Sequence, residues 1–127
     1  MKTCKERIGQ EFFEFKTMLK KAYDYKRAGY IERVGEDIYF TDKAERENKI
    51  DEIYDEVRTL LCTDYVEPGT FGNNKGYLRY QFSWGGPSDE VRVYDSGRAE
   101  YWFMDWYDGA KRIVGSHLVK MLESVYE

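Results

Sequence analysis

Apolar residues recur at helical spacing near the start of the chain. The recurring positions are Ile8, Phe12, Phe15, Leu19 and Ala22 or Tyr23. Steps of three and four residues place them on one side of an α-helix. Gly29 follows the basic residues Lys26 and Arg27, a combination typical of helix C-termini. The pattern therefore predicts an amphipathic helix from about Lys5 to Arg27.

A second helical pattern follows in the stretch TDKAERENKIDEIYDEVRTLL, residues 41–61. Asp42 is expected to cap this helix, with Glu45 three residues on to reach back to it. The predicted buried side consists of Ile50, Ile53, Tyr54, Val57, Leu60 and Leu61. Between the two helices, residues 30–40 are predicted to form an irregular or short extended connection with a turn in VGED.

The period of the apolar positions changes to two after residue 76. In YLRYQFSW, residues 77–84, alternation predicts a half-buried strand with Leu78, Tyr80, Phe82 and Trp84 on the buried face. EVRVYD predicts a second strand, which Ser96-Gly97 joins to a third strand in RAEYWFMDWY. An Asp108-Gly109 turn is predicted to lead into a short fourth strand in KRIV. Ser116 is predicted to begin a closing helix.

The stretch TDYVEPGTFGNNKG, residues 63–76, is predicted to be a long loop with a type II turn at Pro68-Gly69. The expected fold is α+β, with two N-terminal helices, a three- to four-stranded antiparallel β-meander and a short C-terminal helix. It is expected to form a single domain over residues 1–127. Its helical half covers about 1–62, and its sheet and closing helix cover 77–127.

The composition limits the classes of protein to which the chain can belong. The chain has 127 residues, of which 42% are hydrophobic and 35% charged, as in a folded domain and unlike a disordered tail or a membrane span. Its first residues lack the apolar core of a signal peptide, so a cytoplasmic location is expected. Cys4 and Cys62 show no metal-ligand spacing with the one histidine and are expected to be free thiols.

Aromatic residues fall on both faces of the third predicted strand. Tyr101 shares one face with Phe103, whereas Trp102 shares the other with Trp106. A strand that is apolar on both faces must be covered twice, by the rest of the chain, by a second copy or by a partner protein. The residues predicted to contact a partner are Tyr101, Trp102, Trp106 and Tyr107, with Glu52, Asp55 and Glu56 on the acidic side of the second helix as electrostatic support.

Charged residues suggest two alternative functions, a metal-dependent nuclease and a nucleic-acid-binding module. Asp89, Asp105 and Asp108 could bind a divalent metal in a nuclease, although Asp residues beside turns usually have structural roles. Lys75, Arg79 and Arg92, with the basic first helix, could instead bind nucleic acid. The formal net charge of −4 argues against direct binding of duplex DNA. No catalytic residue, resident metal or cofactor is predicted.

The segments SWGGPSDEVRVY and EYWFMDWYDGAKR resemble small, mostly uncharacterised proteins of phages, plasmids and other bacterial mobile elements. The matching positions are Gly85, Gly86, Pro87, Asp105, Trp106, Asp108, Gly109 and Ala110. The resemblance covers about residues 76–115 and carries no established catalytic residue. It implies a protein that binds and inhibits host defence machinery, such as a CRISPR effector or another defence nuclease. The expected function is therefore stoichiometric, non-enzymatic inhibition of the anti-CRISPR type.

Overall fold

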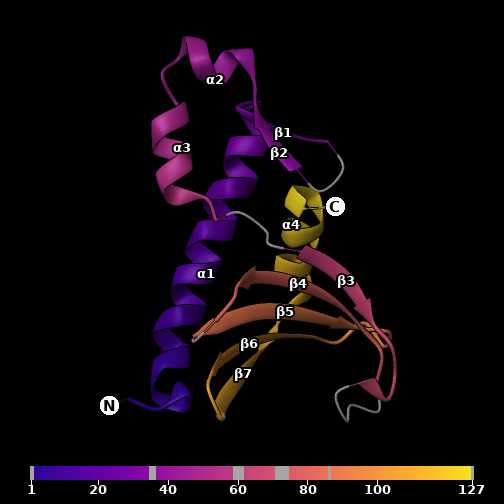
Figure 1. Ribbon diagram of the computed structural model, residues 1–127. Helices are drawn as coiled ribbons and strands as arrows, with labels where there is room; N and C mark the ends of the chain where they lie inside the picture. The colour runs from indigo at the N-terminus through magenta and orange to yellow at the C-terminus, as the bar shows by residue number, and fades with distance from the viewer. Residues whose placement is uncertain (1, 35–36, 59–61, 71–74, 86, 127) are drawn as a thin grey trace. The chain divides into compact units, whose positions relative to one another are not determined.

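Five antiparallel strands form the larger of two sheets in the computed structural model, which describes residues 2–34, 37–58, 62–70, 75–85 and 87–126. The strands are β3 (Cys62–Val66), β4 (Tyr77–Ser83), β5 (Ser88–Tyr94), β6 (Ala99–Asp105) and β7 (Asp108–Val114). Their order in the sheet is their order in the chain, so β3 and β7 are its edges (Figure 1). The prediction of an α+β fold with an antiparallel meander and helices at both ends of the chain is confirmed.

One strand lies in a stretch that was predicted to be a loop. β3 pairs with β4, with Asp64 opposite Arg79. The Arg79 guanidinium donates two hydrogen bonds to the Asp64 carboxylate, at 2.9 and 2.7 Å. Because this partner lies on another strand, the local sequence pattern does not show it. The sheet consequently has five strands, and the prediction of three or four was wrong.

The type II turn predicted after this strand is present. The Thr70 N–H donates to the Glu67 carbonyl oxygen at 3.1 Å, which closes a four-residue turn with Pro68 and Gly69 at its centre. Gly69 has φ +89°, the conformation that a type II turn requires at its third residue. This prediction was correct because the turn depends on local backbone preferences.

One face of the sheet carries an apolar core. Its buried residues include Tyr80, Phe82, Val91, Tyr101 and Phe103. The first turns of α1 (Cys4–Arg27) pack on this face, where the Phe12 ring stacks on Tyr101 with a centroid distance of 5.3 Å. The Tyr101 hydroxyl donates to the carboxylate of Asp89 at 2.6 Å, and Asp89 is only 3% exposed. The core thus contains a carboxylate held by a buried phenol.

Trp84 lies outside this core, although the alternation of β4 predicted it to be buried. The pairing of β4 with β5 shifts register between Gln81 and Ser83, and the strand ends at Ser83. Trp84 therefore follows the strand and is 75% exposed. A register shift moves the residues that follow it out of the alternating pattern.

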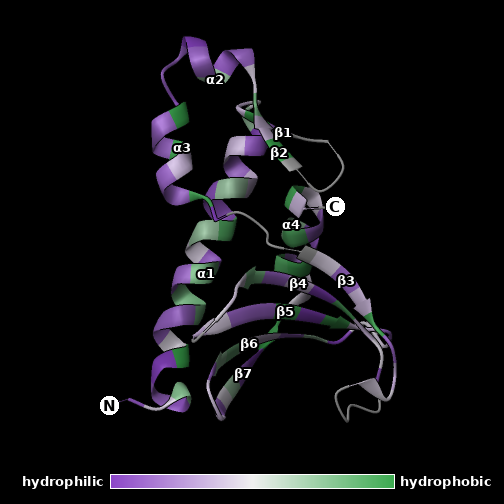
Figure 2. Ribbon diagram, viewed as in Figure 1, coloured by the Kyte–Doolittle hydropathy of each residue, from purple (hydrophilic) through white to green (hydrophobic). Residues whose placement is uncertain are grey.

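The chain divides into two compact units, Met1–Phe13 with Leu60–Ser116, and Glu14–Thr59 with His117–Glu127. The first unit contains the sheet and the start of α1. The second contains the rest of α1 together with β1 (Ile31–Val34), β2 (Asp37–Phe40), α2 (Asp42–Arg46), α3 (Ile50–Glu56) and most of α4 (Ser116–Tyr126). In Figure 2, hydrophobic and hydrophilic bands alternate along α1, whereas α2 is mostly hydrophilic.

The single helix predicted over residues 42–61 is divided in two. Asn48 has φ +56°, a left-handed conformation that asparagine tolerates better than most residues, and it lies between α2 and α3. The second of these helices ends at Glu56. Leu60 and Leu61, which were predicted to continue its buried side, lie outside the described residues.

The helix cap also differs from the prediction by one residue. Thr41 is the N-cap of α2, and its Oγ1 accepts a hydrogen bond from the Ala44 N–H at 3.3 Å. Asp42, the predicted cap, is instead the first residue of the helix. An acidic residue in the first turn still complements the helix dipole there.

Residues 30–40, predicted to be an irregular or short extended connection, contain an antiparallel hairpin. Ile31 pairs with Phe40, and Glu32 pairs with Tyr39. Gly35 and Glu36, in the predicted VGED turn, lie outside the described residues. The segment was too short for its pattern to distinguish two strands from an extended connection.

The C-terminal helix α4 is present as predicted. Met121, Leu122 and Val125 are buried, and the Tyr126 hydroxyl donates to the Arg58 carbonyl oxygen at 2.8 Å. Cys4 is a free thiol, as predicted, whereas the side chain of Cys62 lies outside the described part of the structure. None of the helices described combines the length and the apolar character needed to cross a membrane.

Removing the Tyr101 hydroxyl should destabilise the sheet unit. Tyr101→Phe deletes one of the donors to the buried Asp89 carboxylate and leaves the Ser83 hydroxyl as another, so the free energy of unfolding should fall by about 1.5 to 3 kcal/mol. Urea denaturation measures this loss. Tyr107→Phe is the matched control, because Tyr107 is fully exposed and its hydroxyl should contribute less than about 0.5 kcal/mol. Equal stability of the two variants would contradict the prediction.

Candidate functional site

The two most exposed of the large hydrophobic side chains described form the tip of the β6–β7 hairpin. Trp106 is 88% exposed and Tyr107 is 105% exposed. Asp105 pairs with Asp108 across the hairpin, so Trp106 and Tyr107 are the two residues of the turn. The sequence predicted this turn at Asp108-Gly109, because Asp-Gly is a common turn signal. Those two residues begin β7 instead.

Trp106 has a backbone conformation that is unusual for a tryptophan. Its φ is +55°, in the left-handed region. Glycine commonly takes such a conformation at the first position of a two-residue hairpin turn. For other residues, sparsely populated conformations of this kind cost about 1 to 3 kcal/mol and persist only where the surrounding structure holds them. Strained residues of this type also cluster at functional sites.

Two contacts with the start of α1 hold the tip in this conformation. On one side of the turn, the Arg7 guanidinium pairs with the Asp105 carboxylate at 3.3 Å. On the other side, the Cys4 N–H donates to the Asp108 carboxylate at 2.7 Å. Both residues that flank Trp106 and Tyr107 are therefore anchored to the same helix. The turn presents its two aromatic rings from a fixed backbone.

The electrostatics at the N-terminus of α1 favour the contact with Asp108. Asp108 places a negative charge at the positive end of the helix dipole. The hydrogen bond from the Cys4 N–H lowers the pKa of Asp108, and the Gly109 N–H, which donates at 2.9 Å, lowers it further. Burial raises the pKa of the Cys4 thiol, and the nearby Asp108 charge adds to that increase. The anchor therefore combines a charged carboxylate with a neutral thiol.

A third exposed aromatic residue belongs to the same end of the sheet. Trp84 lies in the connection between β4 and β5. Because Ser88 at the start of β5 pairs with Met104 near the end of β6, this connection and the β6–β7 turn leave the sheet at the same end. Two strand spacings, about 10 Å, separate them along the sheet. We call Trp84, Trp106 and Tyr107 the aromatic end of the sheet.

Tyr101 and Trp102, also predicted to contact a partner, lie within β6. Tyr101 is 0% exposed, so its ring belongs to the core and is not accessible to a partner in this structure. Trp102 lies on the opposite face and is partly buried. The Arg92 guanidinium is 4.0 Å and the Lys111 amine 5.4 Å from its ring centroid. Cations of the chain itself therefore contact the Trp102 ring.

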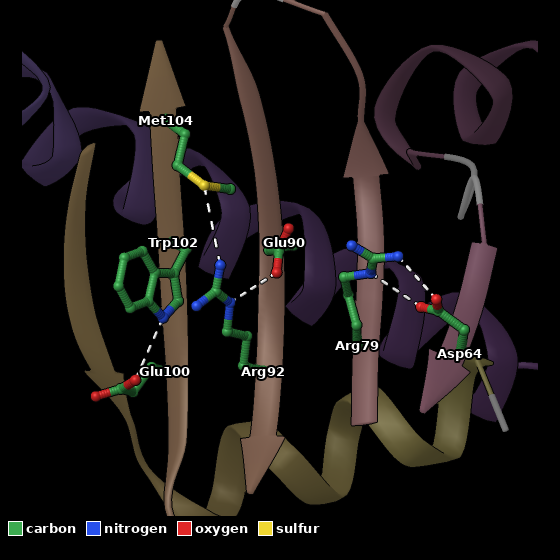
Figure 3. A network of polar contacts seen from close by, with 7 residues as sticks. All are labelled: Asp64, Arg79, Glu90, Arg92, Glu100, Trp102 and Met104. Carbon is green, nitrogen blue, oxygen red and sulfur yellow. Dashed lines mark hydrogen bonds and ion pairs between the residues drawn. The ribbon is translucent and has the colours of Figure 1, made fainter. Parts of the chain in front are cut away.

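Paired charges cover this second face of the sheet (Figure 3). Arg79 pairs with Asp64, and the Arg92 Nε donates to Glu90 at 2.7 Å. The Glu90 side chain is only 4% exposed, so its charge is compensated within the sheet. The arginines proposed for nucleic-acid binding already have carboxylate partners. Lys75, the third candidate cation, is exposed just before β4.

Glu100 is the second buried carboxylate of this face. Its side chain is 4% exposed, and it accepts from the Trp102 indole and pairs with Lys111, both at 3.2 Å. Burial alone would raise the pKa of Glu100, but hydrogen bonds from Tyr94, Lys111 and Trp102 outweigh burial and lower it. The folded structure therefore stabilises the charged form of Glu100.

The acidic side of α3 is partly occupied by contacts within the chain. Glu56 accepts the Tyr25 hydroxyl at 2.6 Å and pairs with Lys21 at 3.3 Å. Glu52 accepts the same hydroxyl at 3.2 Å. Burial, followed by the hydrogen bond to Glu56, raises the pKa of Tyr25. Two of the three predicted acidic contacts thus link α3 to α1, whereas Asp55 is exposed.

The three carboxylates considered for a metal-dependent nuclease have separate structural roles. Asp89 accepts the buried Tyr101 hydroxyl, whereas Asp105 and Asp108 anchor the hairpin tip. Within the ranges that the structure describes, no group of three or more His, Cys, Asp or Glu residues could hold a metal ion. The arrangement therefore offers no support for the nuclease hypothesis.

Comparison of the chain with protein-family models, with curated proteins and with solved structures found no match. The interpretation of function therefore depends on the geometry above and on the resemblance of the sheet segments. The sequence indicated Trp106 and Tyr107 but placed Trp84 in the core. The one local signal that Trp84 follows the strand was the adjacent Gly-Gly-Pro, which interrupts strands.

Lowering the pH should weaken the anchor of the hairpin tip. Because the pKa of Asp108 is lowered in the folded state, its charge stabilises the fold above the ordinary value of 3.8. This contribution is lost as the pH falls through the lowered value. Asp108→Asn should therefore melt below the wild type at about pH 6, and the difference should shrink towards about pH 2.

Thermal melts followed by circular dichroism over this pH range test the prediction. Asp55→Asn is the matched control, because Asp55 is exposed on α3. The control should melt close to the wild type at every pH. A difference between Asp108→Asn and wild type that does not change with pH would contradict the role of the charge.

Removing the Arg92 side chain should destabilise the sheet. Arg92→Ala leaves the buried Glu90 carboxylate without its guanidinium, so the free energy of unfolding should fall by about 3 kcal/mol or more. Arg98→Ala is the control, because the Arg98 side chain is 53% exposed and its ion pair with Glu100 should contribute less than about 1 kcal/mol. Chemical denaturation of both variants compares them. Similar losses would show that burial of Glu90 does not depend on Arg92.

Proposed function

We propose that the protein is a non-enzymatic inhibitor that binds a partner protein through the aromatic end of its sheet. The observation that carries this proposal is the Trp106-Tyr107 turn, with two almost fully exposed rings on a strained backbone anchored on both sides. Tryptophan and tyrosine are enriched among the residues that contribute most to binding energy. A backbone held before binding also lowers the entropy lost on association.

The nature of the partner is inferred from the resemblance to small proteins of phages and other mobile elements. The positions that carry it include Pro87 in the β4–β5 connection and, around the turn, Asp105, Trp106, Asp108, Gly109 and Ala110. These positions flank the aromatic end, so the resemblance and the exposed rings concern the same end of the sheet. We therefore propose anti-CRISPR-like occlusion of a host CRISPR effector or another defence nuclease in the bacterial cytoplasm.

Replacing Trp106 with glycine should separate binding from folding. Glycine adopts a positive φ without strain, so Trp106→Gly should leave the free energy of unfolding unchanged or raise it by about 1 kcal/mol. Its affinity for the partner should fall at least about tenfold, because an exposed aromatic anchor is lost. Urea denaturation gives the stability, and calorimetry against a panel of purified CRISPR effectors and defence nucleases gives the affinity.

Tyr54→Ala is the matched control for this experiment. Tyr54 is 76% exposed on α3 and belongs to the other compact unit. Its removal should leave the affinity unchanged. The proposal fails if both variants bind equally well, or if the wild type forms no one-to-one complex with any member of the panel.

A further inference from the structure

The polar atoms of the aromatic end are hydrogen-bond donors without partners among the described residues. Of the three tryptophans of the chain, Trp102 donates its indole N–H to Glu100 at 3.2 Å. No described group bonds to the indole N–H of Trp84, the indole N–H of Trp106 or the hydroxyl of Tyr107. An indole N–H is a donor only, and a phenol hydroxyl can also donate. The aromatic end therefore offers three donors on apolar rings, and a ligand must supply the acceptors.

The charges next to these rings are compensated within the chain. The β4–β5 connection, residues 84–87, contains no charged residue. Of the two carboxylates that flank the β6–β7 turn, Asp105 pairs with the Arg7 guanidinium and Asp108 accepts the Cys4 N–H. A ligand at the connection or the turn thus meets apolar rings and donors, and an uncharged segment suits this site.

The space beside Trp84 is open. Apart from its chain neighbours, a side chain at Gly85 would meet no described atom within 4 Å of its Cβ. The Trp84 ring is itself 75% exposed. A ligand can therefore lie against this ring without displacing any described part of the chain.

The three donors indicate which backbone conformation fits. An α-helix bonds most of its carbonyl oxygens internally, and a β-strand also brings N–H groups, for which an indole has no acceptor. A polyproline II helix has no internal hydrogen bonds, so its carbonyl oxygens are open, and its prolines carry no N–H. Proline-rich segments also dock in grooves lined by aromatic side chains. Such a segment matches both the rings and their donors.

The spacing of the aromatic residues suits the same ligand. The β4–β5 connection, which carries Trp84, and the β6–β7 turn lie two strand spacings apart, about 10 Å. One turn of a polyproline II helix contains three residues and rises about 9.3 Å. Prolines one turn apart would therefore meet Trp84 and the Trp106-Tyr107 turn at the same time. Because both connections join strands of one sheet, the sheet holds this spacing.

We propose that the aromatic end binds a proline-rich segment of the partner in the polyproline II conformation. The indole N–H groups of Trp84 and Trp106 and the hydroxyl of Tyr107 donate to carbonyl oxygens of the segment, and its proline rings pack against the aromatic rings. This inference rests on the proposed function, since it names the chemistry of the partner at the same site. A polyproline II segment is ordered before binding, so it loses little conformational entropy on association.

Two synthetic peptides of about twelve residues test the ligand class. One repeats Pro-Pro-Ser, which favours the polyproline II conformation, and the other repeats Ala-Ala-Ser, which has N–H groups in place of the prolines. Calorimetry should give the proline peptide an affinity at least about tenfold higher, because its conformation is already that of the bound state. Equal affinities, or no binding of the proline peptide, would overturn the inference.

The indole N–H signals provide an internal control in the same titration. In NMR spectra, the proline peptide should shift the indole N–H signals of Trp84 and Trp106. The signal of Trp102 should stay in place, because its N–H already donates to Glu100. A shift of the Trp102 signal alone, or equal shifts of all three, would contradict binding at the aromatic end.

Variants of Trp84 separate the ring from its donor. Trp84→Ala should lower the affinity for the proline peptide at least about tenfold, because an aromatic contact is lost. Trp84→Phe keeps a ring but removes the N–H, so its affinity should fall by about two- to tenfold. Tyr54→Ala, on the exposed side of α3, is the control and should bind like the wild type. Unchanged binding in Trp84→Ala, or dimerisation of the wild type that Trp106→Gly prevents, would assign the rings to another ligand.

Failure of this inference and failure of the proposed function give different results. Suppose that an effector from the panel binds the wild type but not Trp106→Gly, and that the proline peptide neither binds nor displaces it. The proposed function then stands, and the proline-rich ligand is wrong. If instead the proline peptide binds at the aromatic end but no effector binds the wild type, the site recognises proline-rich segments and the proposed inhibitor function is wrong.

Discussion

The candidate site depends on two contacts between the β6–β7 hairpin and the start of α1. The Cys4 N–H and the Arg7 guanidinium bind Asp108 and Asp105, residues about a hundred positions further along the chain. The first backbone N–H groups of a helix have no partner within it, and the helix dipole favours negative charge beside them. A carboxylate from the hairpin meets both requirements. The same pair of contacts holds Trp106 in its left-handed conformation.

The two faces of the sheet use charge in different ways. On the face covered by α1, aromatic packing encloses Asp89 and its phenol partner. On the other face, Glu90 and Glu100 are buried beneath the cations that compensate them. A charge that already has a partner would have to give up that contact to bind a new one. The rings of the aromatic end would not have to give up such a contact, because all three are exposed.

The anchored turn would set how the aromatic rings meet a partner in the proposed complex. Exposed aromatic rings contribute through burial of apolar surface, which depends little on direction. The contacts of Asp105 and Asp108 with α1 fix the backbone that carries Trp106 and Tyr107, so the turn would supply the direction. A small domain could in this way cover a functional surface of a larger enzyme without any chemistry of its own.

The periodicity of apolar residues and the turn signals were sufficient to predict α1, α4 and the strands β4 to β6, because these elements carry core residues. The strand β7 was expected only from Lys111, because the turn before it was placed two residues too late, and most of β7 is exposed. The periodicity did not show β3, which pairs with β4 and places Asp64 opposite Arg79, or the break at Asn48. The sequence by itself determined that an aromatic segment would lie in a sheet. Only the tertiary structure decided that Tyr101 is buried while Trp106 is exposed, because contacts with the distant α1 cover the first ring and anchor the turn that carries the second.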